Sequence, residues 1–372
     1  MKAIGIILAG GNNNRMKELT AKRAVPALPV AGSFRSIDFA LSSMSNSHIQ
    51  TVAVLTQYNA RSLNEHLSSS KWWNFGRKQG GLFLFTPTVT ADNSDWYRGT
   101  ADAMYQNIDF LKRRHEPYVI ISSGDCVYKL DFNRVLDFHI EKKSDITVVC
   151  KDMMYNDDVS RFGVVRMDDE SRITEFDEKP IEALSNTIST GIYVIRRRQL
   201  IELLEVAAEE NRFDFVNDIL VRYKNVKKIY GYKINSYWNN IADIDAYFKT
   251  NMDFLRPDVR SYFFREEPTI CSKVDDLPPA KFNPGSDISN SLVSSGCIIN
   301  GSVEDSVLFK QVFVGKNTTV KNCVILNDVY IGDNVHLENC IVESRGTINP
   351  NTCYCGEDGV MIVKEKNVRY VI

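Results

Sequence analysis

The chain has 372 residues, two to three times the usual size of a domain, so it is too long for one small module. Its composition is 44% hydrophobic and 25% charged with 20 Gly and 11 Pro, which is globular and excludes disordered and collagen-like classes. The 45 basic and 47 acidic residues leave a formal net charge of -2, with no basic excess to neutralise a phosphate backbone. We therefore expect two domains and no nucleic-acid partner.

Apolar runs of four to eight residues alternate with helical patterns through the first two-thirds of the chain, which is typical of strands buried on both faces. This alternation predicts an α/β, Rossmann-like domain with a mixed, mostly parallel sheet over residues 1–254. The predicted strands are Ala3–Leu8, Val52–Leu55, Tyr118–Ser122, Ile146–Cys150 and Gly191–Ile195. The predicted helices are Ser36–Ser45, Ala101–Arg114 and Arg198–Glu209. An irregular, Pro-bearing stretch follows, and we expect a linker over residues 255–285.

A repeat begins after this linker. Ser306–Val320 aligns without a gap on Cys323–Leu337, and branched residues recur six positions apart within each coil. The six-residue pairs are Leu292/Ile298, Val314/Val320 and Ile331/Leu337. About three such hexads per coil predict a parallel β-helix over residues 286–372, with an antiparallel sandwich as the alternative. The only histidine of this segment, His336, is expected at the surface rather than as the base of an acyltransferase.

The eight cysteines are scattered, mostly in apolar runs, which favours buried free thiols over a disulfide framework. Cys353 and Cys355 form a Cys-x-Cys pair without a second pair or a nearby His, so zinc is not expected there. The apolar N-terminal run ends in Gly10-Gly11 and predicts a strand entering a loop, not a cleaved leader. No run approaches the ~20 apolar residues of a membrane span. We therefore expect a cytoplasmic protein without membrane contact.

The Gly10-Gly11 turn follows the first predicted strand, at the sheet edge where α/β proteins bind ligands. Glycines there let backbone N–H groups approach a phosphate, although neither a Walker loop nor a Gly-x-Gly-x-x-Gly motif is present. Further motifs follow in order along nearly the whole chain. They are Arg15-Met16, Arg23-Ala24, Pro26-Ala27, Trp96–Ala103, Ser123-Gly124-Asp125, Phe176–Pro180 and Ser189–Tyr193. This ordered set resembles the glucose-1-phosphate adenylyltransferase family.

The resemblance implies a nucleotidyltransferase domain followed by a left-handed β-helix. It also implies a reaction of ATP with glucose 1-phosphate that yields ADP-glucose and pyrophosphate, with Mg²⁺ as cofactor. The implied nucleotide-binding residues are Gly10, Gly11, Arg15, Gly99 and Asp102. Arg15 and Asp125 are the implied catalytic residues, with Asp125 also a metal ligand, and Glu178, Lys179 and Ser189 would contact the sugar phosphate.

Several positions depart from the family pattern. Asn13 and Asn14 replace a loop Gly and Thr, Val25 stands where the family has a Lys, and Asn240 stands where it has a second metal-binding Asp. Loss of one of two carboxylates and a phosphate-facing Lys is expected to cost on the order of 10³ or more in rate. These changes remove phosphate and metal contacts, whereas the sugar-side residues keep their types.

Within the family that the chain resembles, these losses favour a GlgD-type subunit that is weakly active or inactive. The resemblance implies that such a subunit assembles with the catalytic subunit into a heterotetramer that controls glycogen synthesis. One alternative is an active enzyme in which water or Asp243 completes the metal site. A homo-oligomer is the alternative to the heterotetramer. Another is a scaffold without ligand binding, like the nucleotidyltransferase-fold subunits of a translation exchange factor.

Overall fold

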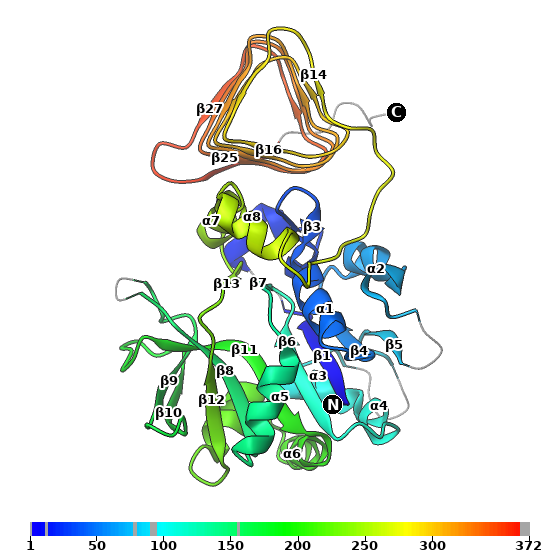
Figure 1. Cartoon of the computed structure of the whole chain (residues 1–372), viewed down its shortest axis with the longest axis vertical. Helices are drawn as coiled ribbons and strands as arrows, with labels where there is room; N and C mark the ends of the chain where they lie inside the picture. The colour runs from blue at the N-terminus through cyan, green and yellow to red at the C-terminus, as the bar shows by residue number, and fades with distance from the viewer. Residues whose placement is uncertain (1, 12–13, 77–79, 90–94, 155–156, 365–372) are drawn as a thin grey trace.

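The computed structural model describes residues 2–11, 14–76, 80–89, 95–154 and 157–364; Asn13 of the predicted phosphate loop lies outside them. Figure 1 shows an α/β part and, above it, coils of triangular cross-section seen end-on. No helix among these residues has the length and apolarity required to cross a bilayer.

The α/β part is built on a mixed, mostly parallel sheet, as predicted. Parallel strands β6, β1, β4 and β5 form one half, and antiparallel β11 joins β6 to β8 and β9 in the other half. The strands are β1 (Ala3–Ala9), β4 (Thr51–Thr56), β5 (Gly81–Phe85), β6 (Tyr118–Ser123), β8 (Ile146–Asp152), β9 (Gly163–Met167), β10 (Ile173–Glu178), β11 (Thr187–Arg196) and β12 (Ile229–Lys233). Two short pairs lie outside it: β2 (Pro29–Val30) with β3 (Phe34–Arg35), and β7 (Cys126–Tyr128) with β13 (Trp238–Asn240).

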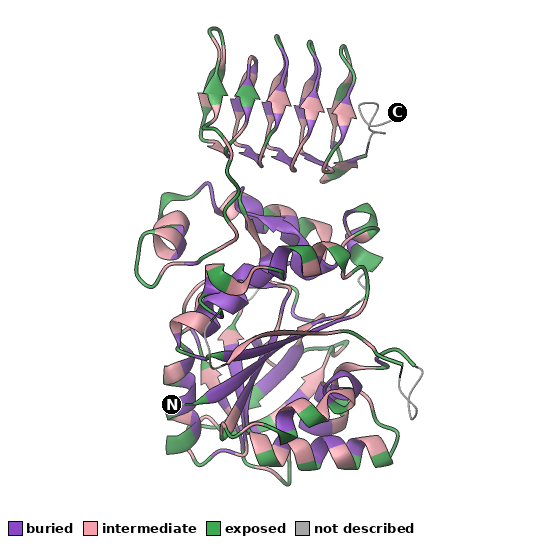
Figure 2. Cartoon of the chain, turned by 90° about the vertical axis from the view of Figure 1, so that its right-hand side faces the viewer, coloured by how far each residue is buried: buried purple, intermediate pink, exposed green. Residues whose placement is uncertain are grey.

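Helices cover both faces of the sheet, so its central strands are buried (Figure 2). The helices of the α/β part are α1 (Ser36–Asn46), α2 (Arg61–Leu67), α3 (Thr100–Gln106), α4 (Ile108–Lys112), α5 (Phe132–Glu141), α6 (Arg197–Glu209), α7 (Ile244–Asp253) and α8 (Pro257–Phe264). Of these, α7 and α8 lie next to the β-helix (Figure 1). The single helix predicted over residues 101–114 is divided into α3 and α4. The division lies at Asn107, whose side chain donates to the Ala103 carbonyl and the Tyr97 hydroxyl and so competes with the helical ladder.

Helix α8 occupies a stretch that the sequence predicts to be irregular. Its buried Val259 and Phe263 face a core shared by both parts of the molecule, and the Phe263 ring meets Phe39 edge-on at 5.3 Å. Proline at its first turn is compatible with helix initiation because that N–H has no intrahelical acceptor. Tertiary burial of this apolar face therefore outweighs the local irregularity of the sequence.

The C-terminal part is the predicted left-handed type of parallel β-helix, and its all-parallel pairing excludes the antiparallel sandwich. Its three sheets run β14-β17-β20-β23-β26, β15-β18-β21-β24-β27 and β16-β19-β22-β25-β28. The strands are β14 (Lys281–Phe282), β15 (Asp287–Ser289), β16 (Leu292–Val293), β17 (Ile298–Ile299), β18 (Ser302–Glu304), β19 (Val307–Leu308), β20 (Phe313–Val314), β21 (Thr319–Lys321), β22 (Val324–Ile325), β23 (Tyr330–Ile331), β24 (His336–Glu338), β25 (Cys340–Val342), β26 (Thr347–Ile348), β27 (Cys353–Cys355) and β28 (Met361–Val363).

The inward positions of the coils follow the six-residue rhythm in two of the three predicted pairs. Val314/Val320 and Ile331/Leu337 are fully buried, but Ile298 is 38% exposed. Its neighbours on either side point inward instead, and Leu292 packs against the α/β part near Gly32. The strand register aligns Ile299 with Val314 and Val293 with Leu308, so the inward residues of the first coil are Val293 and Ile299, and the predicted pair Leu292/Ile298 is wrong by one position.

Direct contacts join the two parts. An ion pair of 2.5 Å links Arg23 to Glu343, and the Ser294 hydroxyl donates to the Gly32 carbonyl at 2.9 Å. A common apolar cluster also includes Tyr247 of α7 and Val324 of β22. The β-helix is therefore packed on the α/β part and not merely tethered to it (Figure 2).

Candidate functional site

A cavity of about 470 Å³ opens at the carboxyl ends of β1 and β4. Five of the residues selected from the sequence line it: Gly10, Gly11, Val25, Gly99 and Asp125. Among the described lining residues Asp125 is the one carboxylate and Arg98 the one cation. The cavity therefore lies at the carboxyl ends of parallel strands, where open α/β sheets bind ligands. Its described wall, however, carries little charge for binding phosphates.

Two glycines let the backbone come close at the cavity edge. A Cβ on Gly10 would lie 3.3 Å from Cβ of Gln57, and one on Gly99 only 2.3 Å from the Phe213 carbonyl oxygen. That carbonyl accepts the N–H groups of Ala101 and Asp102, at 2.8 and 3.2 Å. Gly99 is therefore required for packing α3 against the Phe213 segment, whatever its contact with a nucleotide.

The wall around Gly99 is held by side chains whose role the sequence did not reveal. The Gln57 amide accepts from the Tyr97 N–H at 2.6 Å and donates to the Tyr97 carbonyl at 3.2 Å. Buried Asp102 accepts from the Arg98 N–H at 2.8 Å and from the Gln106 amide at 3.0 Å. Asp102 is thus engaged with its own helix turn and is not among the residues that line the cavity.

Asp125 and Asn240 meet where β7 pairs with β13. Asp125 Oδ1 accepts from the Ser123 hydroxyl at 2.5 Å, and Asn240 lies opposite Cys126 in the strand register. The Asn240 amide is bonded at both ends: Nδ2 donates to Cys126 Sγ at 3.4 Å, and Oδ1 accepts from the Ala242 N–H at 3.0 Å. Burial raises the pKa of the Cys126 thiol well above its ordinary value, so this cysteine packs as an uncharged group.

Asp243, the alternative metal ligand, is engaged by two protein partners in this structure. Its Oδ1 caps helix α7 by accepting from the Ala246 N–H at 2.8 Å, and its Oδ2 forms an ion pair with Arg161. Burial lowers the pKa of Arg161, and the charge of exposed Arg15 adds to this effect, so Arg15 lies on the same side as this pair. Both Asp243 oxygens therefore have protein partners, and Arg15 belongs to this cluster rather than to the cavity lining.

Val25 shows the opposite environment from a phosphate-binding lysine. It is 4% exposed and packs in an apolar cluster with Met16, Leu19 and Tyr247, while one side reaches the cavity. A lysine with this backbone would have to extend its amine along the cavity wall to escape the apolar cluster. Asn14 is exposed and precedes Arg15 in a short 3-10 turn.

The predicted sugar-phosphate residues form a second group outside the cavity lining. Lys179 pairs with Glu178 at 3.3 Å, and buried Ser189 donates to the Tyr193 hydroxyl at 3.3 Å. Burial raises the pKa of Tyr193, and the charges of Glu178 and Asp214 add to this effect, so these groups share one environment. Burial raises the pKa of Glu178, opposed by the neighbouring Lys179. These residues therefore form a polar cluster with an exposed amine at its edge.

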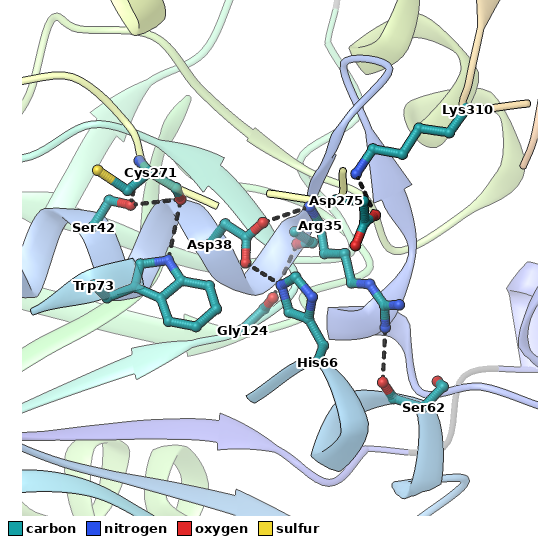
Figure 3. Close-up of polar contacts among 11 residues, drawn as sticks. Arg35, Asp38, Ser42, Ser62, His66, Trp73, Gly124, Cys271, Asp275 and Lys310 are labelled. Carbon is teal, nitrogen blue, oxygen red and sulfur yellow. Dashed lines mark hydrogen bonds and ion pairs between the residues drawn. The ribbon is translucent and has the colours of Figure 1, made fainter. Parts of the chain in front are cut away.

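The loop that carries Asp125 is supported from behind by helix α1. The Ser36 hydroxyl donates to the Gly124 carbonyl at 2.9 Å, and Asp38 accepts from the Arg35 N–H at 2.8 Å (Figure 3). The other Asp38 oxygen lies 2.6 Å from Nε2 of His66, and both side chains are buried. This network explains why the Ser-Gly-Asp turn keeps its shape.

Two family models match the chain. Residues 4–256 match the Nucleotidyl transferase model, and residues 278–362 match that of the GlmU-like C-terminal hexapeptide. Glucose-1-phosphate adenylyltransferase of Geobacillus stearothermophilus is 39% identical over 365 residues, covering 97% of this chain and 94% of its own. The chain belongs to the glucose-1-phosphate adenylyltransferase family. Enzymes of that name from Pseudothermotoga lettingae and Bacillus subtilis are 39% and 36% identical over 322 residues, 86% of this chain and 76% and 84% of theirs.

For a member of the glucose-1-phosphate adenylyltransferase family, the Asp125–Asn240 pair fits Mg²⁺ poorly. Mg²⁺ is held by anionic oxygens in octahedral geometry, whereas here the residue opposite Cys126, next to Asp125, carries an amide already bonded at both ends. Three metal-binding groups do not converge near Asp125 within the part of the chain that the structure describes. We therefore derive no chemical step through a metal ion at this site.

Proposed function

We propose that this chain is a GlgD-type subunit of a bacterial glucose-1-phosphate adenylyltransferase, weakly active or inactive by itself, that modulates a catalytic subunit in glycogen synthesis. The reaction of the assembly would be that of ATP with glucose 1-phosphate to ADP-glucose and pyrophosphate. Its partner would be the catalytic subunit in a heterotetramer, with a homo-oligomer as the alternative. A cytoplasmic location is part of the same proposal, as are an α/β domain of residues 1–254, a linker of residues 255–285 and a β-helix domain of residues 286–372.

The observation that carries the proposal is the amide of Asn240 beside Asp125. Mg²⁺, which the nucleotidyltransferase family generally uses, would have to be held mainly by Asp125 and by substrate phosphates. Burial of Val25 in an apolar cluster removes a second positive contact to phosphate. Metal and cation contacts each contribute several kcal/mol to phosphoryl-type transition states, so their joint loss supports weak catalysis.

The remaining site residues are assigned the roles that the family resemblance implies. Gly10, Gly11 and Gly99 would approach the nucleotide by their backbones, with Arg15 and Asp102 supporting the same side. Glu178, Lys179 and Ser189 would hold glucose 1-phosphate: the amine would pair with the phosphate, and the carboxylate would accept from sugar hydroxyls. Retention of these three residue types favours a ligand-binding subunit over a pure scaffold.

Coexpression with the catalytic subunit tests the proposal directly. We expect the two chains to copurify, the isolated chain to turn over at ~10⁻³ or less of the catalytic subunit's rate, and the complex to respond differently to activators. Turnover by the isolated chain near the catalytic subunit's rate contradicts the proposal. Glucose 1-phosphate binding by calorimetry, lost in Lys179→Ala but kept in the exposed control Lys143→Ala, separates the ligand-binding subunit from a scaffold.

A further inference from the structure

Four metal-binding side chains lie together on the outer face of the β-helix. Strands β24 and β27 pair in parallel with His336 opposite Cys353 and Glu338 opposite Cys355. Between the outward residues, Leu337 points into the coil and is fully buried. Because one coil is seventeen residues long, residues distant in sequence become neighbours across the two strands. This corrects the expectation that no histidine lies near the Cys-x-Cys pair.

The distances between the donor atoms suit a small metal ion. Cys353 Sγ and Cys355 Sγ are 3.6 Å apart, and His336 Nε2 lies 3.5 Å from Glu338 Oε2. One donor atom from each of His336, Glu338 and Cys355 lies within 4.8 Å of the other two. With zinc bonds of ~2.0 Å to nitrogen and ~2.3 Å to sulfur, donors in a tetrahedron are ~3.3–3.8 Å apart. Two of the contacts already have this spacing, and side-chain rotation could shorten the others.

The types of donor select among metals. Two thiolates, one imidazole and one carboxylate form a borderline-soft set that suits Zn²⁺ and disfavours Mg²⁺ and Ca²⁺, which take oxygen ligands. We propose that Cys353, Cys355, His336 and Glu338 form a Zn²⁺ site that clips two neighbouring coils of the β-helix together. On binding, each thiol releases its proton to solvent and forms a Zn–S bond, while the neutral imidazole donates a nitrogen lone pair.

Backbone hydrogen bonds already fix the two strands that carry these side chains in the absence of a metal ion. The His336 N–H donates to the Thr352 carbonyl and the Gly356 N–H to the Glu338 carbonyl, each at 3.0 Å, at the two ends of the strand pair. Binding would therefore order side chains and not the chain, which lowers its entropic cost. In a solenoid each coil is stabilised by its neighbours, so a clip near one end of the stack resists fraying there.

Metal titration of the full chain tests this site without reference to catalysis. After chelation and thiol reduction, we expect one equivalent of Co²⁺ to produce sulfur-to-cobalt charge-transfer and strong tetrahedral d–d absorption, and Zn²⁺ to displace it. The double variant Cys353→Ser/Cys355→Ser should bind Zn²⁺ at least ~100-fold more weakly, because even outer-shell changes cost 10–100-fold. Cys271→Ser, an exposed cysteine far from the cluster in sequence, is the matched control and should bind normally.

Three results would overturn the proposal: no cobalt–thiolate absorption in the unmodified chain, unchanged Zn²⁺ binding in the double variant, or equal loss in the Cys271 control. The spectrum of the unmodified chain requires no variant, so the test remains decisive if the double variant fails to fold. A raised unfolding temperature with Zn²⁺, absent with Mg²⁺ and absent in the double variant, is the further expected result. This site is independent of the proposed subunit function, so either can fail alone.

Discussion

The side-chain amide of Asn240 donates from Nδ2 to Cys126 Sγ at 3.4 Å, one residue from the carboxylate of Asp125. An aspartate at this position would lose that donor and bring a second anion to the same edge of the strand pair. Two neighbouring carboxylates repel unless a cation lies between them. We therefore expect the residue at position 240 to influence whether this edge attracts a divalent ion.

Asn240→Asp together with Val25→Lys is expected to create Mg²⁺-dependent ATP binding. Each restored contact is worth several kcal/mol in the transition state, so turnover should rise by at least ~10-fold above the unmodified chain. Calorimetry with and without Mg²⁺ and a pyrophosphate-release assay measure the two effects. Asn239→Asp, on the neighbouring residue of β13 opposite Val127, is the control and should change neither.

Gly99→Ala is expected to destabilise the protein by about 1–3 kcal/mol, because the new methyl group would lie 2.3 Å from the Phe213 carbonyl oxygen. Gly11→Ala has no described atom within 4 Å of its new Cβ and should stay within ~0.5 kcal/mol. Denaturant unfolding of the two variants compares them. Equal denaturant midpoints for the two variants would show that the Phe213 segment can shift to accept the methyl group. Gly99 would then not be required for packing.

Asp38→Asn is expected to cost roughly 2–3 kcal/mol. Its carboxylate accepts from the Arg35 N–H and lies 2.6 Å from His66 Nε2, and an amide cannot accept on both sides. Exposed Glu65, paired with Arg61 across one helix turn, supplies the control: Glu65→Gln should change stability by less than ~0.5 kcal/mol. If both variants lose the same free energy of unfolding, the buried Asp38–His66 contact contributes no more than the exposed Arg61–Glu65 pair.

Stability is expected to fall in mild acid because of His139. Burial, assisted by the charge of Arg196, lowers the pKa of His139 from its ordinary 6.5 to about 4. The unfolded chain then binds more protons than the folded one between these values, so unfolding becomes easier as pH drops from about 6.5 to 4. The full effect is at most about 3 kcal/mol at 1.36 kcal/mol per pKa unit. His139→Gln should flatten this part of the stability–pH curve, whereas exposed His115→Gln should leave it unchanged.

Local patterns predicted the elements well where one period ran without interruption. The strand at Ala3–Leu8 was visible as a continuous apolar run because both of its faces are buried, and the seventeen-residue coil was visible because branched residues recur every six positions. The patterns failed where a side chain competed with the backbone, as at Asn107, and where a distant apolar surface ordered a helix, as at α8. At Asn107 the cause is a side-chain hydrogen bond that a periodic pattern does not include. At α8 the cause is packing against residues far away in the sequence.

The candidate site divides in the same way. The motifs located the cavity edge through Gly10, Gly99 and Asp125, since glycine and a turn aspartate are needed wherever a strand ends at a ligand. They could not show that Asp243 is already bonded to Arg161 and the α7 N-terminus, or that Gln57 holds the Tyr97 backbone. Those pairings depend on the register of the strands and on the direction of the side chains. A short sequence motif contains no information on either.

By itself, the sequence determined the chain length, the period of the C-terminal repeat and the residue types at each position. Comparison with the family pattern then showed that Val25 and Asn240 stand in place of a lysine and an aspartate. Only the tertiary structure decided what those residues touch. It placed the Asn240 amide against Cys126 and brought His336 beside Cys353 across one coil of the β-helix. The physical reason is that strand pairing converts sequence separation into a spacing of a few ångströms, and hydrogen bonds and metal ligation act only at that range.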